Sequence, residues 1–82
     1  TLRRRRDING LIRALSDPTG IVRLTAAEAL GSTGDERALE PLERLKFSDP
    51  DIGVRQAASL AHARVAARLA EKKAVEGWLL DR

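Results

Sequence analysis

The stretch Ser16-Asp17-Pro18-Thr19-Gly20-Ile21-Val22-Arg23 decides the fold, because its key residues recur later in the chain. Ser16-Asp17-Pro18 returns as Ser48-Asp49-Pro50, and Val22-Arg23 returns as Val54-Arg55, each 32 residues farther on. A fixed period of this size is typical of stacked helical hairpins. Small residues that allow close helix packing recur in the same register: Ala26, Ala29, Ala58 and Ala61.

Apolar spacing predicts four helical segments and almost no strand. They are expected at residues 8–15, 21–32, 36–47 and from 52 onward. The turn Asp17-Pro18-Thr19-Gly20 separates the first two, since proline fixes φ and glycine admits conformations that other residues resist. Asp7 and Asp35 are expected to cap the first and third segments. Pro41 lies inside the third, so the first turn of that helix should be offset or kinked.

The second copy lacks the glycine-containing terminator of the first. Leu30-Gly31-Ser32-Thr33-Gly34-Asp35 is replaced by His62-Ala63-Arg64-Val65-Ala66-Ala67, and the next glycine along this segment is Gly77. This predicts one helix of roughly 30 residues, well above the usual length. The alternative is a break near Ala63 that starts a third hairpin and folds it back on the stack.

Such a long helix would carry two nearly opposite apolar sectors. One sector contains Val54, Ala58, Ala61 and Val65, and the other contains Leu60, Ala63, Ala67, Ala70, Ala74 and Trp78. Two apolar faces need two partners, which are the preceding helices and either further repeats or a second copy of the chain. We therefore expect the isolated chain to form a homodimer through this helix. The candidate interface comprises Leu60, Ala67, Ala74, Trp78 and Leu79.

Composition narrows the classes of function. The 82 residues suit one small domain, and the absence of cysteine excludes disulfides, thiolate nucleophiles and thiolate metal sites. A reducing, cytoplasmic compartment fits that absence. No apolar run approaches the roughly 20 residues that span a bilayer, and no signal-peptide pattern is present, so no membrane partner is expected. Because the chain begins at Thr1 rather than at methionine, we expect a piece of a longer protein.

The positive charge of the chain is concentrated in one run. Arg3, Arg4, Arg5 and Arg6 supply four positive charges, so the net charge of +3 becomes −1 without them. A basic run with no interleaved aromatic residue is typical of a solvated tail, and we therefore do not expect nucleic acid as a partner. The alternative is a phosphate-contacting arm.

An aspartate in each turn precedes an arginine on the next helix by six residues. The two pairs are Asp17 with Arg23, and Asp49 with Arg55. Aspartate accepts hydrogen bonds from helix-start amides and arginine offers a fork of five donors, so the pairs can tie turns together within or between repeats. We expect a structural ladder, with a ligand-binding role for the arginines as the alternative.

Signals for catalysis are poor. His62 is the single histidine and has no second ligand at metal-site spacing. Glu36, Glu40 and Glu43 line one helix, but a two-repeat stack offers little of the pocket that paired carboxylates need. We therefore expect no enzyme activity of the chain itself, and no catalytic residue, cofactor or metal ligand.

At this point the residues resemble a known family, the HEAT repeats, and most closely the short HEAT-like repeats of the phycobilisome-lyase type. The resemblance covers Asp7 to Ala61 and is carried by the two Asp-Pro and Val-Arg pairs, by Ala26-Ala27-Glu28-Ala29-Leu30-Gly31 and by Gly34-Asp35-Glu36-Arg37-Ala38. It implies an all-α fold, an α-solenoid of about two helical hairpins. The expected segments are a basic tail at 1–6, repeats at 7–34 and 35–63, and at 64–82 a helical extension or the start of a third repeat.

The same resemblance implies a non-catalytic protein–protein interaction or scaffold module, a fragment of a longer HEAT-repeat protein. One alternative is a substrate-positioning module of a bilin-lyase-like enzyme complex. Another is a nucleic-acid-binding solenoid that uses Arg3 to Arg6. The repeat pattern predicts the fold well but predicts the function poorly, because one fold can carry binding or catalytic sites of many kinds.

Overall fold

Helices account for almost all of the structure. The computed structural model describes residues 2–80, with side chains from residue 7 onward. Its elements are α1 (Leu2–Ala14), α2 (Gly20–Thr33), a 3₁₀ turn η1 (Glu36–Ala38), α3 (Leu39–Ser48) and α4 (Ile52–Leu80). No strand occurs within these described residues, which confirms the all-α prediction.

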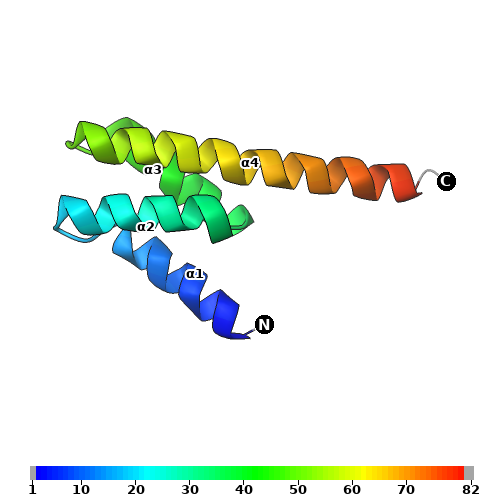
Figure 1. Cartoon of the computed structure of the whole chain (residues 1–82), viewed down its shortest axis with the longest axis horizontal. Helices are drawn as coiled ribbons and strands as arrows, with labels where there is room; N and C mark the ends of the chain where they lie inside the picture. The colour runs from blue at the N-terminus through cyan, green and yellow to red at the C-terminus, as the bar shows by residue number, and fades with distance from the viewer. Residues whose placement is uncertain (1, 81–82) are drawn as a thin grey trace.

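The helices form two stacked hairpins, α1 with α2 and α3 with α4 (Figure 1). The α2 and α4 helices lie side by side, and α3 packs against α4. Toward its N-terminus, α1 diverges from α2 and leaves the body of the stack. This is the helical-hairpin architecture expected from the 32-residue period.

The core lies between the two hairpins. Its largest fully buried side chains are Leu30, Leu42, Val54 and Val65. The contact between α2 and α4 is close, because a Cβ on Gly31 would lie only 3.2 Å from the Cα and Cβ of Ala61. Small residues at this crossing therefore set the distance between the two helices, as the recurring alanines predicted.

The first helix begins six residues earlier than expected. It starts at Leu2, so Asp7 lies within the helix instead of capping it, and Arg3 to Arg6 are helical rather than part of a tail. The prediction gave too much weight to Asp7 as a start signal. Arginine is a good helix former, and no glycine or proline interrupts the stretch between Leu2 and Asp7.

The start of the third helix is offset, as Pro41 predicted. Asp35 caps η1, and its carboxylate accepts a hydrogen bond from the amide of Arg37 at 3.0 Å. The α-helix proper then begins at Leu39, which places Pro41 in its first turn. Amides in the first turn have no acceptor within the helix, so the proline removes no intrahelical hydrogen bond there.

The last helix is continuous, and the alternative of a break near Ala63 is wrong. α4 contains 29 residues, which corresponds to a length of about 43 Å at a rise of about 1.5 Å per residue. Its buried residues end at Val65, and all residues from 70 to 80 are exposed. Figure 1 shows the C-terminal part of α4 continuing past the end of α2. No helix in the described part of the chain is long and apolar enough to cross a membrane.

Candidate functional site

Arg23 joins the two interhelical turns. Its Nη1 donates a hydrogen bond to the backbone carbonyl of Asp17 at 2.7 Å, and its Nε donates to Oδ2 of Asp49 at 2.7 Å. Asp17 lies in the turn before α2, and Asp49 lies in the turn before α4. One guanidinium therefore connects turns that are a full repeat apart.

The carboxylate of Asp49 is buried and has its own set of partners. Its side chain is 3% exposed, and Oδ1 accepts a hydrogen bond from the amide of Asp51 at 2.9 Å. Burial alone would raise the pKa of Asp49. The hydrogen bonds from Arg23 and Asp51, together with the positive charges of Arg23 and Arg55, outweigh burial and hold that pKa below its ordinary value. Asp49 is therefore the ionised centre of the contact between repeats.

Within each repeat the aspartate and the arginine meet through the backbone. Arg55 repeats half of the Arg23 pattern, because its Nη1 donates to the carbonyl oxygen of Asp49 at 2.7 Å. The carboxylate of Asp17 instead accepts a hydrogen bond from the amide of Thr19 at 2.8 Å. The carboxylate contact thus runs from one repeat to the next, and the contact inside a repeat uses a carbonyl.

Arg68 makes a second long-range contact, which the sequence reasoning missed. Its Nη1 and Nη2 donate to the carbonyl oxygens of Gly31 and Gly34 at 2.6 and 2.7 Å. The last carbonyls of a helix lack intrahelical donors and carry partial negative charge, and α2 has no basic residue in its last turn. That missing cation was the available signal, but the sequence alone could not point to a donor 37 residues away.

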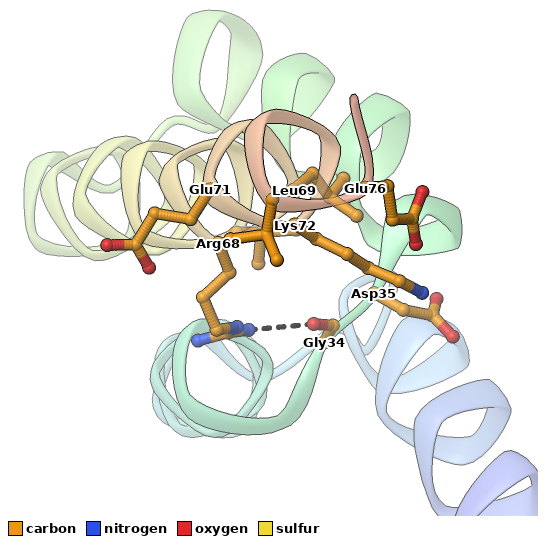
Figure 2. A pocket seen from close by; sticks show the side chains of 9 residues that line it. Gly34, Asp35, Arg68, Leu69, Glu71, Lys72 and Glu76 are labelled. Carbon is orange, nitrogen blue, oxygen red and sulfur yellow. Dashed lines mark hydrogen bonds between the residues drawn. The ribbon is translucent and has the colours of Figure 1, made fainter. Parts of the chain in front are cut away.

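A groove of about 790 Å³ opens beside Arg68, between α4 and the turn that follows α2. Figure 2 shows the Arg68 contact with Gly34 and the side chains of Lys72 and Glu76 around the opening. Its lining residues combine apolar and charged side chains of both signs: Gly34, Asp35, Val65, Arg68, Leu69, Glu71, Lys72, Val75 and Glu76. An apolar floor with a mixed charged rim suits a protein side chain better than an anion or a cation.

The residues predicted to form an interface all lie on α4 and are exposed. Leu60, Trp78 and Leu79 are 55%, 58% and 59% exposed, and Ala67 and Ala74 are also in the exposed class. By its spacing along the helix, Leu79 belongs to the sector of Val54, Ala58, Ala61 and Val65 rather than to that of the other four. Six exposed positions form a continuous stripe, here called the outer face of α4, with Trp78 at its border: Leu60, Ala63, Ala67, Ala70, Ala74 and Gly77.

The structure does not gather the other polar candidates into one site. His62 is half-buried on α4, and Glu36, Glu40 and Glu43 are exposed on η1 and α3. No group of three or more His, Cys, Asp or Glu side chains that could hold a metal ion occurs among the described residues. The side chains of the Arg3 to Arg6 run lie outside the described set, so their contact with phosphate stays a prediction.

Comparison with known proteins identifies the repeats. The family of HEAT repeats matches residues 2–76, which extends the resemblance well beyond Ala61 and into the long helix. A deoxyhypusine hydroxylase from Candida glabrata is 49% identical over 45 residues, covering 55% of this chain and 14% of that protein. The chain therefore spans a small fraction of that relative's length. No solved structure matches the chain significantly.

Proposed function

This chain belongs to the HEAT-repeat family, and on that premise we propose that it is a non-catalytic protein–protein interaction module within a scaffold. The observation that carries the proposal is the C-terminal part of α4. Every residue from 70 to 80 is exposed although the segment contains Val75, Trp78, Leu79 and Leu80. Exposed apolar surface of this kind marks protein interaction sites.

The energetics of the segment support a partner. Isolated helices shorter than about 12–15 residues are marginal in water, and most helical stability in proteins comes from packing an apolar face. Beyond Leu69 the helix has few neighbours of its own, with the groove on one side and the outer face on the other. A partner that covers this segment would bury apolar side chains that are more than half exposed, and would stabilise the last turns of α4.

Affinity capture with surface variants tests the proposal. The variants Ala67→Glu and Ala74→Glu each place a charge on the outer face. We expect them not to capture proteins that the unmodified chain captures from extracts of cells that naturally make it. Thr25→Glu is a matched control, because Thr25 is exposed on α2 rather than on α4. Identical capture by the unmodified chain and the three variants would contradict an interaction through the outer face. Circular dichroism checks that each variant keeps its helical content.

A second function is favoured by one specific observation, the identity shared with part of a deoxyhypusine hydroxylase. We infer that the chain could serve as a repeat segment that positions a substrate protein within a larger enzyme. An assay of the purified chain for hydroxylation of a deoxyhypusine-containing protein tests whether the chain itself is catalytic. We expect no turnover. Activity of the chain alone would overturn the non-catalytic assignment.

The remaining predictions have narrower support. Membership of the phycobilisome-lyase subtype, a bilin-lyase-like complex and a cytoplasmic location rest on the sequence pattern. Nucleic-acid binding rests on the charge of the Arg3 to Arg6 run, which lies in the first turns of α1. It requires DNA affinity that falls steeply with salt and is lost when the four arginines are replaced. Weak binding without salt dependence would eliminate it.

A further inference from the structure

We infer that the outer face of α4 packs against the outer face of α4 from a second copy, with the two helices antiparallel. The inference rests on the proposed function, because it names the occupant of the surface through which the chain binds protein. Three observations carry it: the spacing of the outer face, the match of residue sizes in one register, and the charges that flank the stripe.

The outer face has the spacing of a helix-packing seam. Its positions alternate steps of three and four residues from Leu60 to Gly77, which keeps them on one line along a helix. All six are exposed, while Ala61 and Val65 on the opposite side of α4 are buried against the stack. A second helix can therefore lie along this stripe without displacing α2 or α3, and Figure 1 shows α4 at the edge of the molecule.

Residue size selects one antiparallel register. In that register Leu60, the one large side chain of the six, lies opposite the partner's Gly77, which has no side chain. The remaining layers pair small residues: Ala63 with the partner's Ala74, and Ala67 with the partner's Ala70. A parallel arrangement would instead place Leu60 against the partner's Leu60 and Gly77 against the partner's Gly77, which leaves crowding at one end and a void at the other.

Charge selects the same arrangement independently. The antiparallel register brings Arg64 beside the partner's Glu71, and two-fold symmetry repeats this pair, so that the dimer gains two ion pairs. Neither Arg64 nor Glu71 forms an ion pair with another described residue of its own chain. In a parallel arrangement the seam would place Arg64 beside the partner's Ser59 and Glu71 beside the partner's Ala66, with no ion pair.

Disulfide trapping tests the direction of the helices. The chain has no cysteine, so every disulfide reports an introduced pair. Equal amounts of an Ala63→Cys chain and an Ala74→Cys chain are mixed and oxidised. Antiparallel packing predicts mainly mixed disulfides, because these two positions face each other. Predominance of disulfides between identical chains indicates parallel packing and overturns the inference, as does a failure of any cross-linking above that of an exposed control, Thr25→Cys.

Charge reversal tests the register by sedimentation equilibrium. Glu71→Arg and Arg64→Glu should each weaken dimerisation about tenfold, because each turns two attractions into repulsions. The combined variant should restore it. Glu76→Arg is the matched control: both glutamates line the groove, but Glu76 lies on the side of α4 opposite the outer face, whereas Glu71 is next to Ala70 of that face. Glu76→Arg therefore makes the same charge change and should leave dimerisation unchanged. Equal effects of Glu71→Arg and Glu76→Arg, or no rescue in the combined variant, would overturn the register.

The two proposals fail separately. A purified chain that stays monomeric at high concentration overturns the dimer, while its capture of other proteins through α4 would still support the interaction module. If the chain forms the expected cross-links but captures no other protein, the antiparallel dimer is supported. The interaction proposed for α4 is then restricted to self-association.

Discussion

Replacement of Arg23 with alanine is the strongest test of how the two repeats are held together. The change removes three hydrogen bonds: one to the carbonyl of Asp17 and one to Oδ2 of Asp49, each 2.7 Å long, and a longer one of 3.4 Å to Oδ1 of Asp49. It also leaves a carboxylate with a side chain 3% exposed without its main counter-charge. Hydrogen bonds to charged groups contribute about 1.5–3 kcal/mol. The hydrogen bond from Asp51 and the charge of Arg55 offset part of the loss, so we expect destabilisation of about 2–3 kcal/mol.

Arg55→Ala provides the matched control for Arg23→Ala. Arg55 makes the same contact with a backbone carbonyl but no ion pair with any carboxylate among the described residues. Its loss should cost about 1 kcal/mol. The difference between the two variants therefore measures the contact between repeats. Urea unfolding of both chains gives the free energies, and a difference of 1–2 kcal/mol corresponds to roughly 4–16 °C in melting temperature for a chain of this size.

A double-mutant cycle completes the test. If Arg23 acts through Asp49, the Arg23→Ala and Asp49→Asn variants should show a coupling energy of about 1 kcal/mol or more. Should Arg23→Ala fail to fold, Arg23→Lys keeps the charge but lacks the fork, and should be destabilised by less. Equal stabilities of Arg23→Ala and Arg55→Ala, together with zero coupling, would refute the reasoning and return Arg23 to the ligand-binding alternative.

Three further predictions follow from the long-range contacts. Arg68→Ala should destabilise by about 1–2 kcal/mol in urea unfolding, because the carbonyls of Gly31 and Gly34 lose a cation; an unchanged midpoint would show that water replaces the guanidinium. Gly31→Val should cost about 1–3 kcal/mol, since even a Cβ would lie 3.2 Å from Ala61; thermal unfolding checks this against Ser32→Val on the exposed side of the same helix. Acid should destabilise the chain as Asp49 is protonated, because the pKa of Asp49 is lower in the folded chain than in the unfolded chain. Its contribution to the free energy of unfolding is complete above the unfolded pKa of about 3.9, and it is lost as the pH falls through the lower folded pKa. Asp49→Asn should flatten that part of the stability profile, and an unchanged slope would contradict it.

The local and periodic features of the chain were readable from sequence. The offset start of the third helical segment follows from the backbone chemistry of Asp35 and Pro41. The two Asp-Pro and Val-Arg pairs indicate the repeat and its period. The start of α1 was misplaced because Asp7 resembles an N-cap residue. The residues before it contain no helix-breaking residue, so the helix begins earlier. Cap residues indicate where a helix is able to begin, and do not prevent an earlier start when the preceding residues are good helix formers.

Contacts between repeats were less predictable. Asp17 and Asp49 each precede the arginine of their own repeat by six residues, but this spacing leaves open whether each bond stays within a repeat. That choice depends on how the hairpins stack, which places the carboxylate of Asp49 near Arg23 and its carbonyl near Arg55. The Arg68 contact has no periodic counterpart, so the repeat pattern could not indicate which residue donates to the end of α2.

The loss of the glycine terminator in the second repeat explains both the Arg68 contact and the exposed face. Had α4 ended at the position equivalent to Thr33, 32 residues later at Val65, Arg68 would not lie on a helix beside the end of α2. The carbonyls of Gly31 and Gly34 would then lack their donor. The same continuation carries the helix beyond the last buried residue, Val65, and so creates apolar surface that the two hairpins cannot cover. One change in the repeat pattern therefore supplies a donor to the carbonyls at the end of α2 and at the same time leaves exposed the surface through which we propose that a partner binds.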